Sequence, residues 1–216
     1  MGLLTGAIRW YGIWVAGVAG YLLGSVLTAD VVARIARGRA SPGDAVDIRS
    51  VGSGNPGAAN VMANMGTGWG IAVLAGDIGK GALAALTGRF LLGGPGAFAA
   101  GIGAVAGHCF PAWADFRGGK GIATSAGTTW VLFPLYVPID MALILVSYLR
   151  IRHATAATFI TSGAFVLAAL AWWRLRLPNA WAPSPGPGLP LYAAATTAMI
   201  VYRFLAAPPH RGDRPR

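Results

Sequence analysis

The sequence contains no glutamate, and charged residues of either sign are scarce in it. Only 11% of the 216 residues are charged, whereas 55% are hydrophobic. A soluble domain of this length needs about a quarter of its residues charged to keep its surface in water. The low charge and the mean hydropathy of +0.58 therefore predict an integral membrane protein. They exclude an ordinary soluble enzyme, a disordered tail and a fibrous repeat.

Cysteine is nearly absent as well, because Cys109 is the only one in the chain. A lone cysteine forms neither an internal disulfide nor a zinc cluster, and we expect no metal ion and no cofactor. The absence of glutamate excludes chemistry that depends on that residue. The net charge of +10 would suit nucleic acid, but no basic stripe with interleaved aromatics is present. We therefore expect no nucleic-acid partner.

Long apolar runs dominate the rest of the sequence and predict an all-α, polytopic membrane bundle that forms one domain over residues 1–216. The first run, residues 10–32, begins with aromatic residues typical of a membrane interface and is too long for a signal-peptide core. Several later runs are short or interrupted by Gly and Pro, which is typical of broken or tilted helices. These runs cover residues 57–75, 80–107, 122–135, 137–149, 156–173 and 189–205. We expect about seven spans, with five or six as alternatives.

Basic residues predict the orientation of the bundle. Residues 34–49 are the most charged stretch, and the positive-inside rule places them in the cytoplasm and the N-terminus outside. Seven spans then also place residues 108–121, residues 150–155 and the C-terminal tail inside. Arg174 and Arg176 fall outside, against the rule. We expect a monomer in the inner (plasma) membrane whose polar loops face the cytoplasm.

The first polar segment, DIRSVGSGNPGAANVMANMG, begins at residue 47. Its glycines can turn successive amides into one concavity that binds an anion. Asn55 is a good helix cap and Pro56 suits a first helical position, so the amides that follow would face the same anion. Asn60 and Asn64 lie one turn apart and favour a polar site, because amides inside a membrane need partners. The alternative is a simple glycine-rich turn between helices.

The same segment matches the dinucleotide-binding pattern G-x-G-x-x-G, with Asp77 twenty residues past Gly57. That pattern requires alternating strands and helices around it. The rest of the chain supplies hydrophobic runs instead, so we reject a nucleotide site.

The second polar segment, GHCFPAWADFRGGKGIATSAG, begins at Gly107 and carries His108 and Lys120 among glycines. Charged groups at a membrane face are costly unless they bind something. It is not a phosphate-binding P-loop, because Ala114 and Gly121 stand where Gly and Ser or Thr are required. The alternative is a basic anchor with a satisfied histidine.

A third polar cluster, RIRHATAATF from residue 150, adds arginines and small hydroxyls, although ordinary flanking charge would look the same. The three segments share one predicted face of the membrane. An anionic ligand with an apolar portion would satisfy both their cations and the surrounding lipid.

These motifs, in this order, resemble the bacterial membrane glycerol-3-phosphate acyltransferases that use acyl phosphate, the PlsY family. The resemblance covers most of the chain. It rests on YLLGS followed by Arg34, GSGNPGAANV, AGDIGKG, GHCFPAWADFRGGKGIATSAG, and residues 152–155 at the place of the family's R-Y-x-S.

The resemblance implies transfer of an acyl chain from acyl phosphate to the 1-hydroxyl of sn-glycerol 3-phosphate, giving lysophosphatidic acid and phosphate. It implies a seven-helix enzyme with these two substrates and membrane lipid as partners. The catalytic residues that it implies are Ser25, Arg34, His108 and Lys120. The substrate-binding residues that it implies are Ser53, Gly54, Asn55, Gly57, Asn60, Thr124 and Thr155. Because acyl phosphate is already activated, we expect direct attack by the hydroxyl, and we expect Cys109 to be a buried apolar residue rather than a nucleophile.

The chain departs from the family pattern at its C-terminal end. Phe204 stands at the position of the family's histidine, and His210 lies too far along the chain to replace it. Ala59 replaces a threonine of the glycine motif. The alternative to an active enzyme is therefore a non-catalytic paralogue, or a transporter that binds a phosphorylated metabolite on the same scaffold.

Overall fold

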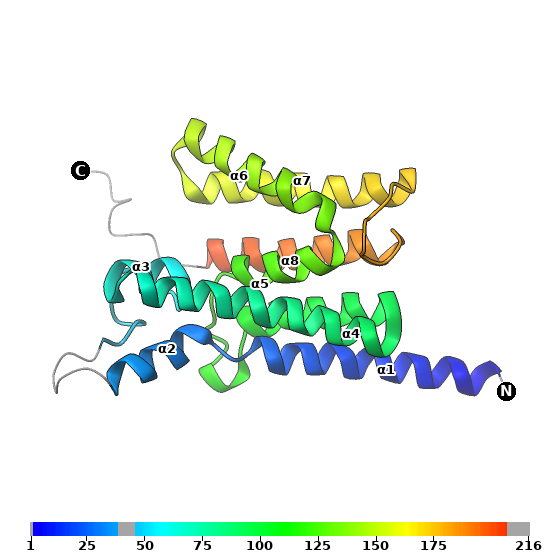
Figure 1. Cartoon of the computed structure of the whole chain (residues 1–216), viewed down its shortest axis with the longest axis horizontal. Coiled ribbons are helices and arrows are strands. Elements are labelled where there is room, and N and C mark those ends of the chain that lie inside the picture. Colours follow the sequence, from blue (N-terminus) through cyan, green and yellow to red (C-terminus); the bar gives the residue numbers. More distant parts are fainter. Residues whose placement is uncertain (1, 39–45, 207–216) are drawn as a thin grey trace.

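The computed structural model describes residues 2–38 and 46–206, and these residues form helices without a β-strand. The prediction of an all-α fold is thereby confirmed over the described residues. The α-helices are α1 (Gly2–Gly24), α2 (Thr28–Arg37), α3 (Ala58–Met65), α4 (Thr67–Cys109), α5 (Ile122–Leu132), α6 (Val137–Ile151), α7 (Ala154–Leu175) and α8 (Gly188–Leu205), shown in Figure 1. Two short 3-10 helices, η1 (Ala112–Ala114) and η2 (Pro134–Tyr136), lie between them.

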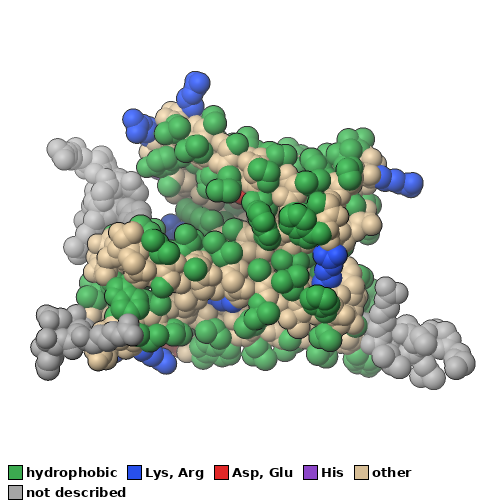
Figure 2. Space-filling view, in the orientation of Figure 1, with side chains coloured by type: hydrophobic (Ala, Val, Ile, Leu, Met, Phe, Trp, Pro, Cys, Tyr) green, Lys and Arg blue, Asp and Glu red, His purple; other side chains and the backbone are tan. Residues whose placement is uncertain are grey.

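Several of these helices are built to lie in lipid. By length and composition, four helical stretches among the described residues could cross a membrane. They are Trp10–Arg37, Thr67–Ala114, Pro134–Ile151 and Ala154–Leu175. Hydrophobic side chains are spread across the face in Figure 2, with few charged side chains among them. The structure supports a membrane bundle but does not confirm a count of seven spans.

Helix α4 is a hairpin rather than one straight span. Gly93 has φ 66° and ψ −150°, which are not helical angles, and the chain reverses there (Figure 1). A Cβ built at Gly88 would overlap the backbone oxygen of Gly96, so the two arms need glycine where they meet. The predicted break between the apolar runs 57–75 and 80–107 was wrong, because residues 75–80 are continuous helix. The helix is interrupted at Gly66 and Gly93 instead. Interrupted apolar runs do not show which glycine breaks the helix.

Close contact between backbones joins α1 to the second arm of α4. A Cβ at Gly20 or Gly24 would overlap the backbone of Ala100 or Ala104, and one at Gly103 would overlap that of Gly17. Small residues let helices approach in this way inside a membrane, where packing and hydrogen bonds replace the hydrophobic effect. The main hydrophobic core is a separate cluster that contains the aromatic residues Phe133, Tyr136, Phe165 and Tyr192.

The helices gather the predicted polar segments at one end of the molecule. In Figure 1, α2, α3, the turn between α6 and α7 and the end of α8 lie toward the left, and the N-terminus and the loop of residues 176–187 lie toward the right. We call the left end the site end. Arg39, Asp44 and the tail arginines lie outside the described residues.

Candidate active site

Residues 47–57, which we call the glycine loop, connect to α3 and are held by one buried asparagine. Asn60, 6% exposed, accepts a hydrogen bond from the Ser53 N–H through Oδ1 at 3.0 Å. Its Nδ2 donates to the carbonyl oxygens of Ile48 at 2.9 Å and Val51 at 3.1 Å. Asn64 in turn donates to Oδ1 of Asn60 at 3.0 Å. The hydrogen bonds of the two predicted asparagines therefore fix the conformation of the glycine loop.

Positive φ angles at Gly52 and Gly54, 58° and 65°, give the glycine loop the turn that an anion nest requires. The Asn55 N–H lies 3.4 Å from Oγ of Ser53, to which it donates. The prediction that Asn55 caps the following helix was wrong. Gly57 is the N-cap of α3, so Pro56 precedes the helix instead of beginning it. Gly57 has an extended conformation and, as a glycine, gives α3 no side-chain cap.

Arg49 joins the glycine loop to two other parts of the site end. Its guanidinium forms an ion pair with Asp30 of α2 at 3.0 Å and donates to the carbonyl oxygen of Arg117 at 2.6 Å. Arg34 is exposed and lies one turn after Asp30 on α2, and residues four apart share a face of a helix. The first and second predicted segments are therefore adjacent.

Residues 117–121, which we call the lysine turn, are fixed by backbone contacts. The N–H groups of Gly118 and Gly119 donate to the carbonyl oxygens of Cys109 at 3.2 Å and His108 at 3.0 Å. Arg203, from the last turn of α8, donates to the carbonyl oxygens of both glycines. A Cβ at Gly118 would overlap the His108 carbonyl oxygen, which explains the glycine there.

Lys120 extends from this turn and is half-buried. Its Nζ lies 4.0 Å from the centroid of the Phe204 ring. Burial lowers the pKa of the Lys120 ammonium below its ordinary value. Phe204 also contacts Phe159, with ring centroids 6.2 Å apart, and this brings the first turns of α7 near Lys120. Thr155, partly buried, lies in the first turn of the same helix.

A buried polar cluster lies inside the bundle and was not among our predicted site residues apart from His108. Nζ of Lys80 is 2.8 Å from Oδ1 of Asp77 and 2.9 Å from Nδ1 of His108. Thr28 donates to Asp77 at 2.9 Å, and Lys80 donates to the carbonyl oxygen of Val26 at 2.7 Å. The signal was present in the sequence, because two opposite charges three residues apart in an apolar run need partners inside a membrane.

Three other side chains discussed in the sequence analysis are also buried. The Ser25 hydroxyl donates to the carbonyl oxygen of Tyr21 at 2.6 Å. Thr124 is fully buried, and its Oγ1 has no hydrogen-bond partner among the described residues. Cys109, 0% exposed, faces Gly121 from inside the bundle. These three side chains are therefore shielded from solvent.

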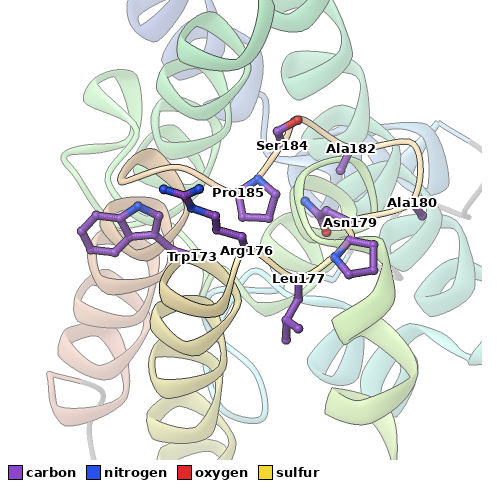
Figure 3. A pocket seen from close by; sticks show the side chains of 9 residues that line it. Trp173, Arg176, Leu177, Asn179, Ala180, Ala182, Ser184 and Pro185 are labelled. Atoms are coloured by element: carbon purple, nitrogen blue, oxygen red, sulfur yellow. The ribbon is translucent and has the colours of Figure 1, made fainter.

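A hollow of about 390 Å³ opens at the end opposite the glycine loop. Figure 3 shows Trp173 and Arg176 on one side of it and Asn179 and Ser184 on the other. None of the predicted site residues lines it. A smaller hollow of about 80 Å³ lies among α5, α6, α7 and α8 and contains Asp140 with several Ser and Thr residues.

Comparison with known proteins identifies the family. The chain matches the family described as glycerol-3-phosphate acyltransferase over residues 14–209. It belongs to the glycerol-3-phosphate acyltransferase family. A member from Pseudomonas aeruginosa PAO1 is 36% identical over 195 residues, which cover 90% of this chain and 93% of that protein. A member from Thermoanaerobacter pseudethanolicus is 36% identical over 163 residues, covering 76% and 78%.

The fold agrees with that of a solved acyltransferase. A crystal structure of PlsY, an integral membrane glycerol 3-phosphate acyltransferase in its glycerol 3-phosphate form, superposes with a TM-score of 0.72. The two chains are 28% identical, and the match covers 89% of this chain and 88% of that one. The resemblance to PlsY in the sequence motifs is thus confirmed, together with membrane integration. The roles of individual residues in this acyltransferase remain predictions.

Proposed function

We propose that this acyltransferase transfers an acyl chain from acyl phosphate to the 1-hydroxyl of sn-glycerol 3-phosphate and releases lysophosphatidic acid and phosphate. The observation that carries the proposal is the junction made by Arg49 between the glycine loop, α2 and residue 117 of the second motif. It brings the glycine loop together with the segments that carry Arg34 and Lys120. Solved forms of PlsY with glycerol 3-phosphate and with lysophosphatidic acid support the choice of acceptor and product.

This arrangement offers cationic side chains to a phosphorylated group. The N–H groups of Ser53, Gly54, Asn55 and Gly57 already donate within the glycine loop or to Asn60. We therefore assign the charge of the phosphate to Arg34 and Lys120, with the glycine loop as a wall of the site. The acyl chain would remain in the apolar bundle or the surrounding lipid. Thr155, in the first turn of α7, would serve as a further hydroxyl partner.

The chemistry needs no covalent intermediate on the protein. The hydroxyl oxygen of the acceptor attacks the acyl carbonyl carbon, and the bond from that carbon to the phosphate oxygen breaks. The hydroxyl proton passes to a phosphate oxygen. Holding both substrates in place and neutralising the leaving phosphate can supply much of the rate. Cys109 is fully buried, which supports direct attack over a thioester.

We propose that the site end faces the cytoplasm in the inner membrane. Arg34, Arg37, Arg150, Arg152 and Arg203 lie at this end, in agreement with the positive-inside rule. A membrane-impermeant reagent that reacts with a cysteine placed at position 37 only after cell lysis supports this orientation. Reaction in intact cells contradicts it.

The decisive assay supplies radiolabelled glycerol 3-phosphate with acyl phosphate, acyl-CoA or acyl carrier protein to membranes containing the protein. We expect lysophosphatidic acid to form only when acyl phosphate is the donor. We expect Lys120→Ala to abolish its formation. Product from acyl-CoA would contradict the proposal that acyl phosphate is the acyl donor. Uptake of label into vesicles without product would identify a transporter, and binding alone a non-catalytic paralogue. Growth of a strain lacking its own first-step acyltransferase provides a second readout.

A further inference from the structure

The three donors of the Lys80 ammonium are all in use inside the bundle. Lys80 is 8% exposed, and its Nζ lies 2.8 Å from Oδ1 of Asp77, 2.7 Å from the carbonyl oxygen of Val26 and 2.9 Å from Nδ1 of His108. A lysine ammonium has three N–H donors and no acceptor. Nδ1 of His108 also lies 3.5 Å from Oδ1 of Asp77. Because the Lys80 ammonium is closer, at 2.9 Å, and can only donate, Nδ1 accepts its third hydrogen bond.

A histidine that accepts at Nδ1 carries its proton on Nε2 and is neutral. The opposite arrangement would have a neutral Lys80 accept a proton from Nδ1. With a neutral imidazole, it would leave the Asp77 carboxylate, 2% exposed, as an uncompensated charge inside the membrane. Such a charge is far more costly than a paired one. An imidazolium would balance Asp77, but the proton would then sit on the imidazole and not on the more basic lysine amine. With a cationic Lys80 and a neutral His108, the charges of the cluster sum to zero.

The Nε2 side of the ring faces the lysine turn. A Cβ built at Gly119 would overlap Nε2 of His108, so the ring lies directly against this glycine. The backbone of His108 holds the same residue, because its carbonyl oxygen accepts from the Gly119 N–H at 3.0 Å. Lys120 is the next residue in the chain.

We propose that Asp77 and Lys80 lock His108 as the neutral Nε2–H tautomer, and that His108 is a positioning residue for the lysine turn instead of a proton acceptor. A general base needs a lone pair within reach of the proton that it removes. Nδ1 is occupied by Lys80, and Nε2 carries a hydrogen. This role replaces the catalytic role predicted for His108 from the sequence.

The tautomer can be measured without any assay of activity. The chain has three histidines, so the full-length protein labelled with 13C and 15N in histidine and placed in lipid nanodiscs gives few ring signals. The His108 signal is assigned by its loss in His108→Gln. We expect a protonated Nε2 and an unprotonated Nδ1. A protonated Nδ1, or an imidazolium at neutral pH, would overturn the proposal.

A substitution of Lys80 tests whether this residue sets the tautomer of His108. Lys80→Met removes the donor to Nδ1, and we expect the His108 signal to change to a mixture of tautomers. His153 serves as an internal control, because its Nδ1 accepts from the Ala156 N–H at 3.3 Å and has no contact with Lys80. An unchanged His108 signal in Lys80→Met would show that Lys80 does not set the tautomer.

Kinetic measurements on variants of His108 provide a second test, which rests on the proposed function. Glutamine can place an N–H near the position of Nε2, whereas the amide of asparagine reaches only the position of Nδ1. We expect His108→Gln to lower kcat by less than about tenfold with its main effect on KM, and His108→Asn to be worse. Loss of a general base costs about 10²–10⁴-fold, so a fall of that size in His108→Gln, with a changed pH profile, would contradict the positioning role. If the wild-type protein has no activity, the spectra still decide the tautomer.

Discussion

The ammonium of Lys120 lies over the ring of Phe204, with Nζ 4.0 Å from the ring centroid. Phe204 occupies the position at which the family resemblance leads us to expect a histidine. Its ring packs edge-on against Phe159 of α7. An aromatic face attracts a cation by about 0.5–1 kcal/mol at an exposed site and by about 2 kcal/mol when desolvated. In this chain an aromatic contact therefore holds the lysine.

Removing the aromatic face while keeping apolar bulk should weaken substrate binding. We expect Phe204→Leu to raise KM for the phosphorylated substrates by about two- to fivefold, the equivalent of 0.5–1 kcal/mol. Phe204→Tyr keeps the ring face and is the matched control. Steady-state kinetics in membranes check this. Equal KM values for the two variants would show that the ring contact has no effect on binding.

Activity should fall at alkaline pH because of Lys120. Burial lowers the pKa of its ammonium, so the positive charge is fully present below that pKa and is lost as the pH rises through it. The loss begins at a lower pH than for an exposed lysine. We expect KM for phosphorylated substrates to rise over this range. In Lys120→Arg the guanidinium stays charged, so the alkaline rise in KM should disappear even if activity is lower. An identical alkaline limb in both proteins would assign it to another group.

Gly118 should not tolerate a side chain. A Cβ there would overlap the carbonyl oxygen of His108, which belongs to the end of α4 and cannot move freely. We expect Gly118→Ala to lower the free energy of unfolding by about 1–3 kcal/mol and to reduce activity strongly. Gly79→Ala is the control, because nothing lies within 4 Å of a Cβ at that position. Thermal unfolding in detergent should separate the two variants, and equal stabilities would argue against the tight turn.

Asn60 should determine the conformation of the glycine loop. Asn60→Ala leaves the Ser53 N–H and the carbonyl oxygens of Ile48 and Val51 without their partner, at about 1–3 kcal/mol for each group that stays buried. We expect faster amide hydrogen exchange over residues 48–57 and a higher KM for glycerol 3-phosphate. Asn60→Asp keeps the acceptor for Ser53 and should be milder. Unchanged exchange in Asn60→Ala would contradict the role of this amide.

The sequence was informative about the glycine loop because the pattern is local. The spacing of glycines and asparagines predicted a nest, and Gly52 and Gly54 have the positive φ angles of one. The N–H groups of the loop nevertheless donate to Asn60 and to acceptors of the loop itself. The helix start was misplaced at Asn55, since a cap preference is weaker than the geometry that Gly57 imposes. The hairpin in α4 was missed because every glycine in residues 75–96 is a candidate break, and packing between its arms selects Gly93.

By itself the sequence determined that the chain is helical, lies in the membrane and carries the motifs of its acyltransferase family, because scarcity of charge and short glycine patterns act over a few residues. The tertiary structure alone decided which charges meet. Asp77 and His108 lie 31 positions apart, and Arg49 reaches Arg117 across 68. A reversal at Gly93 and backbone contact through glycines bring such groups together, and burial then requires each one to find its partner.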